Sequence, residues 1–235
     1  MYTPASPWPR RWVTFGLIWG SLILLVSTMV EPTPHNLTLL FSIAGSGMYT
    51  LALYATRLWW LPWAARRPVR NAILLGIFNA AWIEALFLIL QGIFGASDVA
   101  ASPNLLVDWL LTMPWYIGMV VIFVRVQARR HFSPAVVLLL GAVYEMGADG
   151  VVGGQIIPWL TGTPLNWLAS LIFLLLLAFW EFILVYSSMV LPPAWVLEAL
   201  PSTPSSSSAW WEALKPLLWL IPYTVYLLGV LLLMS

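Results

Sequence analysis

The amino-acid sequence predicts an all-α membrane protein, a polytopic bundle of seven transmembrane helices. Hydrophobic residues make up 61% of the 235 positions and charged residues only 8%, whereas soluble domains carry about 25% charged residues. Seven stretches of about 20 apolar residues follow one another, which is the length that a helix needs to cross a bilayer. The nine arginines all fall in alternate connections between these stretches. Composition, span length and charge placement therefore indicate the same fold class.

The seven spans are read from the apolar stretches and from the residues that interrupt them. We expect them at residues 12–30, 37–58, 71–94, 104–124, 133–152, 165–187 and 216–234. The dipeptide Glu31-Pro32 ends the first span, which follows Arg10 and Arg11 as a signal peptide would. Its length and the lack of a small-residue cleavage site favour a helix of the mature protein.

The arginines also predict an orientation. They precede the first span or lie in the second-to-third and fourth-to-fifth connections: Arg10, Arg11, Arg57, Arg66, Arg67, Arg70, Arg125, Arg129 and Arg130. The opposite connections, at residues 31–36, 95–103 and 153–164, carry none. By the positive-inside rule we expect a cytoplasmic N-terminus and, with an odd number of spans, an external C-terminus. The expected location is the cytoplasmic (plasma) membrane of a bacterium.

The connection before the last span differs from the others. It contains Pro192-Pro193 and the serine run at residues 205–208, followed by Lys215. Proline- and serine-rich segments of this kind are typical of linkers. We therefore expect a flexible cytoplasmic linker that joins an extra seventh helix to the body.

Composition excludes several classes of function. Cysteine is absent, which rules out disulfides and thiolate chemistry. The two histidines, His35 and His131, fall in connections, so neither a buried haem nor a histidine-rich zinc site is expected. A basic patch suited to nucleic acid is also missing. We expect no metal, no cofactor and no nucleic-acid partner.

Five acidic residues interrupt the apolar spans: Glu84, Asp108, Glu145, Asp149 and Glu181. An acid at the centre of a spanning helix costs roughly 2.5–3.5 kcal/mol, while a leucine there returns only about 0.3–0.6 kcal/mol. Four such acids cost on the order of 10 kcal/mol, which is comparable to the stability of many whole proteins. We infer that these acids are retained for a function.

Four of these acids are expected at one level of the membrane, in its outer half. With a rise of about 1.5 Å per residue, Glu84 lies just past the middle of its span and Asp108 about one turn into the next. Glu145 lies beyond the middle of the fifth span, and Asp149 follows it on the same helical face. Glu181 belongs to the inner half. With no base at that level, some of the clustered carboxyl groups must hold protons.

Such a cluster suits three kinds of chemistry. It can transfer protons to and from a substrate, stabilise a cation, or relay protons across the membrane. Structural explanations stand beside these, because single protonated acids also form interhelical hydrogen bonds and a water-filled vestibule tolerates acids at low cost.

Short motifs in the second to sixth spans carry a family resemblance. They are Trp-Ile-Glu-Ala-Leu-Phe at residues 82–87, Asp108 followed by Met113-Pro114-Trp115, Gly-Ala-Val-Tyr at residues 141–144 with acids just after, and Trp180. Together they resemble the emopamil-binding, sterol-isomerase-like proteins of the EXPERA superfamily, over about two thirds of the chain. The chain departs from the family at Ala80, where the family has histidine, and at Leu177, where it has asparagine.

The resemblance implies a division of the chain and a site. Residues 1–35 would hold an extra first helix, residues 36–190 a five-helix core, and residues 191–235 the linker and extra seventh helix. In the family, acids shuttle a proton across a ring double bond, so Glu84 and Asp108 would take those roles, with Trp180 facing the carbocation.

The remaining site residues complete a pocket for a flat apolar lipid. Glu145 and Asp149 would tune the acids or lie across the pocket from them. The expected lining residues are Asn79, Trp82, Trp115, Tyr144, Trp180 and Glu181.

The expected function is isomerisation or related carbocation chemistry, including terpene cyclisation, on a sterol-like or isoprenoid lipid within the bilayer. Two alternatives stay open. One is a non-enzymatic lipid-binding or assembly subunit of a larger membrane complex, and the other is a proton- or cation-coupled transporter. The sequence shows no internal repeat and no paired broken helices, which disfavours the transporter. Assembly into a homo-oligomer also stays open.

Overall fold

The computed structural model describes residues 8–160, 179–198 and 209–234, together with the single positions 162, 172 and 200. Within this part of the chain the secondary structure is helical, with no strand. Six helices are long and apolar enough to cross a membrane, and a bent pair of shorter helices brings the number to seven if it forms one span. The predicted fold class, a polytopic membrane bundle, is confirmed.

The helices follow one another closely along the chain. They are α1 (Trp8–Val30), α2 (Pro34–Ala55), α3 (Arg57–Ala64), α4 (Pro68–Phe94), α5 (Leu105–Arg130), α6 (Pro134–Glu145), the π-helix η1 (Met146–Ile156), α7 (Ile157–Leu160), α9 (Phe179–Val185), α10 (Ser187–Leu197), α11 (Ala209–Ala213), the 3₁₀-helix η3 (Lys215–Trp219) and α12 (Leu220–Met234). Proline in the first turn starts α2, α4 and α6, where its missing N–H has no helical partner to lose. Gly95 ends α4 in the left-handed conformation, which glycine adopts without strain.

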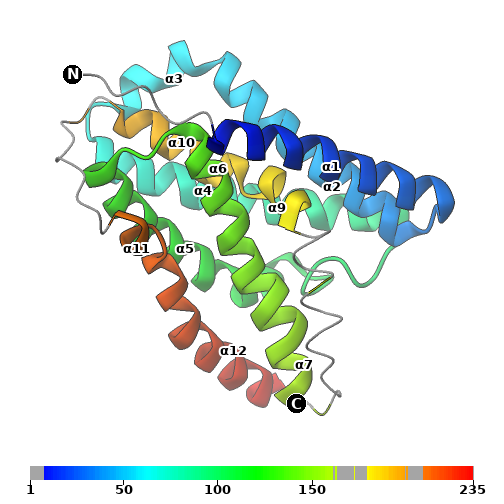
Figure 1. Ribbon diagram of the computed structural model, residues 1–235. Coiled ribbons are helices and arrows are strands. Elements are labelled where there is room, and N and C mark those ends of the chain that lie inside the picture. Colours follow the sequence, from blue (N-terminus) through cyan, green and yellow to red (C-terminus); the bar gives the residue numbers. More distant parts are fainter. Residues whose placement is uncertain are drawn as a thin grey trace.

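Two arms diverge from the arginine-rich end of the bundle (Figure 1). One arm contains α1, α2 and α4. The other contains the continuous rod α6–η1–α7 with α12 beside it, and both end near the C-terminus of the described chain. Helix α10 lies at the centre, where it packs against α4, α2, α6 and α5. The first and last described residues thus lie at opposite ends of the bundle.

Helix α10 extends into the segment that the sequence predicts to be a flexible linker. Residues 191–197 belong to α10 and are almost all buried, including both Pro192 and Pro193. Helices α9 and α10 meet at an angle of 57°, and prolines are tolerated in such membrane helices because neighbouring helices accommodate the freed backbone groups. The linker prediction is therefore wrong for residues 191–197. The serine run at 205–208 and most of the predicted first half of span six lie outside the described residues.

The fifth span is longer than predicted and changes helix type midway. It reaches Leu160 instead of ending at residue 152, and residues Met146–Ile156 wind as a π-helix. Glycine occurs four times in this segment. π-Helices are rare and are frequently found at functional sites, and this one carries Asp149.

Candidate functional site

A cavity of about 430 Å³ lies between α4, α5, the α6–η1 junction and α9. Its lining residues are Ile83, Glu84, Phe87, Asp98, Val99, Ala100, Ala101, Thr112, Tyr116, Glu145, Asp149, Gly153, Gly154 and Val185. The connection between α4 and α5 forms one wall of the cavity through residues 98–101. This connection carries no arginine, so the cavity lies toward the end of the bundle opposite the arginines.

The four acids predicted to share one level are brought together around this cavity. Glu84 interacts with Asp108 through their side chains, and Glu145 interacts in the same way with Asp149. The two pairs also lie close enough for Glu84 and Asp149 to interact electrostatically. Asp108 and Glu145 are buried, whereas Asp149 is exposed and lines the cavity. Glu84, Glu145 and Asp149 thus line one space, and Asp108 lies buried beside Glu84.

Hydrogen bonds distinguish the first pair from the second. The hydroxyl of Tyr116 donates to Oε1 of Glu84. The backbone N–H of Ser102 donates to Oδ1 of Asp108 at 3.4 Å, and the N–H of Ala101 approaches the same carboxyl group. The acids of the first pair therefore receive donors from a tyrosine and from the connection that walls the cavity.

Each pair contains one buried oxygen that no other described donor reaches. These atoms are Oδ2 of Asp108 and Oε2 of Glu145. A hydrogen bond between two carboxyl groups requires one of them to be protonated, because two carboxylates offer no donor. A hydrogen bond within either pair would therefore use one proton shared by its two carboxyl groups.

Two tyrosines at the site were missed by the sequence analysis. Besides its bond to Glu84, Tyr116 lies with its ring 5.7 Å from the ring of Tyr186. The hydroxyl of Tyr186 accepts a hydrogen bond of 2.7 Å from Nε1 of Trp115. Tyr116 follows Asp108 by eight residues, which places both on one side of α5. That spacing is the signal that could have identified it.

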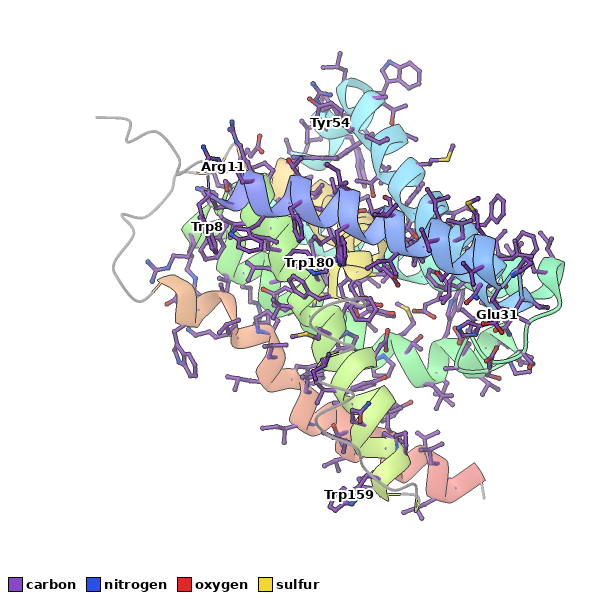
Figure 2. All side chains as sticks on the ribbon, turned by 45° about the vertical axis from the view of Figure 1, so that its right-hand side comes forward. Trp8, Arg11, Glu31, Tyr54, Trp159 and Trp180 are labelled. Carbon is purple, nitrogen blue, oxygen red and sulfur yellow. The ribbon has the colours of Figure 1, made fainter. Side chains whose placement is uncertain are left out.

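Trp180 lies elsewhere, against α1. Its ring stacks on Trp12 at 5.9 Å and meets Phe15 edge-on at 5.2 Å. A Cβ built on Gly16 would lie 2.5 Å from the Trp180 ring, and one on Gly20 would lie 3.0 Å from its backbone, so these glycines form the notch that receives it. Figure 2 shows Trp180 beside the middle of α1, between Arg11 and Glu31. It does not line the acid cavity.

The other predicted lining residues also lie outside the cavity wall. Asn79 accepts a hydrogen bond from Tyr49 at 3.0 Å and donates to the carbonyl of Ser188 at 2.6 Å. Trp82 is exposed, with its ring 6.0 Å from that of Tyr49. Trp115 and Tyr144 are buried in the core, and the hydroxyl of Tyr144 donates to the carbonyl of Ala213 at 2.6 Å. Glu181 is half-buried on α9 and does not line the cavity.

The arrangement is suited to proton transfer. The described residues that line the cavity include the acids Glu84, Asp98, Glu145 and Asp149 and one tyrosine, but no lysine, arginine or histidine. In the part of the chain that the structure describes, the acids do not form a group with the geometry to hold a metal ion. Carboxyl groups held in pairs can hold, give and accept protons.

Comparisons of the chain with protein-family models, curated proteins and solved structures find no match. The resemblance of spans two to six to the EXPERA superfamily is therefore a hypothesis that the short motifs alone carry.

Proposed function

We propose that this protein is an intramembrane acid–base enzyme that shifts a double bond, or closes a ring, in a sterol-like or isoprenoid lipid. The observation that carries the proposal is the two carboxyl pairs, Glu84–Asp108 and Glu145–Asp149: Glu84, Glu145 and Asp149 line one cavity, and Asp108 lies buried beside Glu84. Such an arrangement supplies a proton donor and a proton acceptor within reach of one substrate. Separate environments for two acids are the usual means of giving them opposite roles.

The hydrogen bonds assign a role to each dyad. Glu84 and Asp108 receive an O–H and backbone N–H groups, which suits this dyad to carry negative charge and to accept a proton. Asp149 is exposed and lines the cavity, and its carboxyl group lies beside that of Glu145, which suits it to hold and give a proton. We therefore assign Asp149 as the acid and Glu84 as the base.

The reaction balances without a co-reactant. The carboxylic acid of Asp149 gives its proton to one alkene carbon, whose π electrons form the new C–H bond and leave a cation on the neighbouring carbon. The carboxylate of Glu84 then removes a proton from an adjacent carbon, and that C–H electron pair forms the new double bond. The proton returns from Glu84 to Asp149 across the cavity before the next turnover.

The lining also suits the cationic intermediate. The carboxylates themselves attract positive charge, and the rings of Phe87 and Tyr116 line the same space, where aromatic faces stabilise cations. The volume of about 430 Å³ falls within the range of small-molecule sites, roughly 300–1,000 Å³. Ile83 and Val185 supply apolar contacts for a hydrocarbon.

The proposal is tested by solvent deuterium. Purified protein is incubated in D₂O with sterol and isoprenoid lipids, and deuterium uptake into the lipid is measured by mass spectrometry, because an acid that has exchanged with solvent delivers deuterium to carbon. We expect uptake with the wild-type protein and its loss in Glu84→Gln and Asp149→Asn. Glu181→Gln is the matched control, since it removes an intramembrane acid outside the cavity and should retain uptake.

Two results would contradict the proposal. One is deuterium uptake that is equal in the wild type and in both cavity variants. The other is a lipid that binds the wild type, is lost from Glu84→Gln, and takes up no deuterium from either, which would assign the cavity to lipid binding without chemistry.

A further inference from the structure

Helix α5 contains a proline between two residues of the carboxyl site. Pro114 follows Asp108 by six residues and precedes Tyr116 by two. Because proline has no backbone N–H, the carbonyl of Leu110 loses its hydrogen-bond partner within the helix. An unsatisfied carbonyl in the bilayer interior costs several kcal/mol, so a partner from another element is needed.

Helix α12 and the turn before it supply that partner and two more donors. The hydroxyl of Tyr226 donates to the freed carbonyl of Leu110 at 2.7 Å. The hydroxyl of Tyr223 donates to the carbonyl of Leu111 at 3.2 Å. Nε1 of Trp219 donates to the carbonyl of Pro114 at 2.9 Å.

The three donors lie on one face. They are spaced four and three residues apart, which is the spacing of neighbours along a single helical face. All three carbonyls that they reach lie within one turn of the proline, at the positions of Leu110, Leu111 and Pro114. The aromatic face therefore faces the proline break and supplies a donor to the carbonyl that the proline leaves free.

The fit between the two elements is close. A Cβ built on Gly118 would lie 2.0 Å from Nε1 of Trp219, so only glycine at this position of α5 lets the indole reach its carbonyl. The ring of Trp115 lies 5.9 Å from that of Tyr223. At the start of the segment, Arg130 pairs with Glu212 at 2.8 Å, which fixes the end of α11 to the end of α5.

We infer that the seventh span acts as a splint for α5: Tyr226, Tyr223 and Trp219 hydrogen-bond the carbonyls around Pro114 and so hold the broken turn in place. These three side chains are therefore positioning residues for the carboxyl site. By holding the carbonyls of the broken turn, they set the relation between Asp108 on one side of the break and Tyr116 on the other. The consequence for catalysis rests on the proposed function, but the splint itself does not.

A double-mutant cycle tests the splint. Tyr226→Phe keeps the ring and removes the hydroxyl, leaving the Leu110 carbonyl unpartnered. We expect the unfolding temperature to fall on the order of 3 °C, because a backbone carbonyl left unpaired within the bilayer is destabilising. In a Pro114→Ala background the alanine N–H can bond to Leu110, so the same substitution should cost little. Thr224→Val is the matched control, because that hydroxyl bonds within α12 to Leu220.

The reactivity of Glu84 tests the positioning role. A hydrophobic carbodiimide modifies protonated carboxyl groups, and the hydroxyl of Tyr116 donates to Glu84, which favours the carboxylate. If the splint places Tyr116, then Tyr226→Phe should raise the modification of Glu84 several-fold, measured by peptide mass spectrometry. Tyr116→Phe is the positive control and Thr224→Val should leave the rate unchanged.

The outcomes separate this inference from the proposed function. A fall in unfolding temperature that is equal with Pro114 present and in the Pro114→Ala background would overturn the splint. A background-dependent fall without any change at Glu84 would overturn the positioning role. Absence of lipid turnover in the wild-type protein would count against the proposed function alone, since neither measurement depends on a substrate.

Discussion

Acids at the two ends of the bundle have different neighbours. At the arginine-rich end Glu212 pairs with Arg130 at 2.8 Å and lies 3.6 Å from Lys215, so the acid there has bases beside it. In the cavity toward the other end, Glu84 and Asp149 face further acids and no described base.

The difference separates an acid that has bases beside it from acids that have none. A paired acid near the surface joins two helices at low cost. Unpaired acids within a membrane bundle are expensive and mark sites of proton or ligand chemistry. The contrast therefore predicts opposite effects on stability and on activity when acids of the two ends are made neutral.

The largest expected effect is on turnover at the cavity. Asp149→Asn should lower the turnover of the lipid substrate on the order of 10²–10⁴-fold, the usual contribution of a general acid. The unfolding temperature should stay equal or rise, because a neutral amide replaces an acid that lacks a base. Lipid conversion and thermal unfolding of the same preparation measure both. A large loss of stability with normal turnover would reverse the distinction between the two ends.

A second substitution tests how closely the segment around Trp219 fits against α5. A Cβ at residue 118 would lie 2.0 Å from Nε1 of Trp219, so Gly118→Val forces the indole to move. Overpacking of this kind typically costs about 1–3 kcal/mol, and the bond to Pro114 is lost as well. Thermal unfolding measures the effect. Gly92→Ala is the control, because a Cβ there meets nothing within 4 Å; equal unfolding temperatures for the two variants would contradict the close fit.

A smaller effect is expected at the arginine-rich end. Glu212→Gln should lower the unfolding temperature and leave turnover unchanged, since Glu212 joins α11 to the end of α5. The loss should shrink at high salt, which screens ion pairs near the surface. Glu198→Gln, at an exposed acid after α10, serves as the control. Loss of turnover in Glu212→Gln at full stability would place this acid with the functional group.

The smallest effect is expected at the wall of the cavity. Asp98 lies 3.1 Å from Nδ1 of His35, and the hydrogen bond from His35 holds the pKa of Asp98 below its usual range. A lowered folded-state pKa stabilises the protein above the unfolded value of about 3.9, and that stability is lost as the pH falls through the folded value.

The pH dependence of unfolding tests whether the Asp98–His35 contact stabilises the protein in this way. Asp98→Asn should unfold at a slightly lower temperature than the wild type near neutral pH, and the difference should vanish in acid below the folded pKa. A difference that grows in acid would show that the contact acts in some other way.

Parts of the site could be inferred from sequence because helix geometry is regular. The level of Glu84, Asp108 and Glu145 follows from their distance to the span ends, since every helical residue adds the same rise. In the structure Glu84 and Glu145 line one cavity, and Asp108 lies buried beside Glu84. The hydrogen bond from Tyr116 to Glu84 was missed, because the two residues lie on different helices and 32 positions apart in the sequence.

Other expectations depended on packing that a linear sequence does not contain. Trp180 was expected beside the acids but enters the notch of Gly16 and Gly20 on α1. The seventh span was expected to be an added helix, yet its aromatic residues donate hydrogen bonds to the backbone carbonyls around Pro114 in α5. Residues 191–197 looked like a linker because proline pairs end helices in water, whereas here they lie buried in the bundle.

The helical class, the number of long apolar spans and the placement of acids along them are properties of local composition, because hydropathy and helical rise are summed along the chain. Which faces meet is a property of the whole fold. The joining of the acids into two dyads, the donation by Tyr116, the bend between α9 and α10 and the bracing of Pro114 all require side chains from distant segments to fit one another. Close packing in the interior selects those partners by shape and by hydrogen bonding, and neither is expressed in the order of residues within a single span.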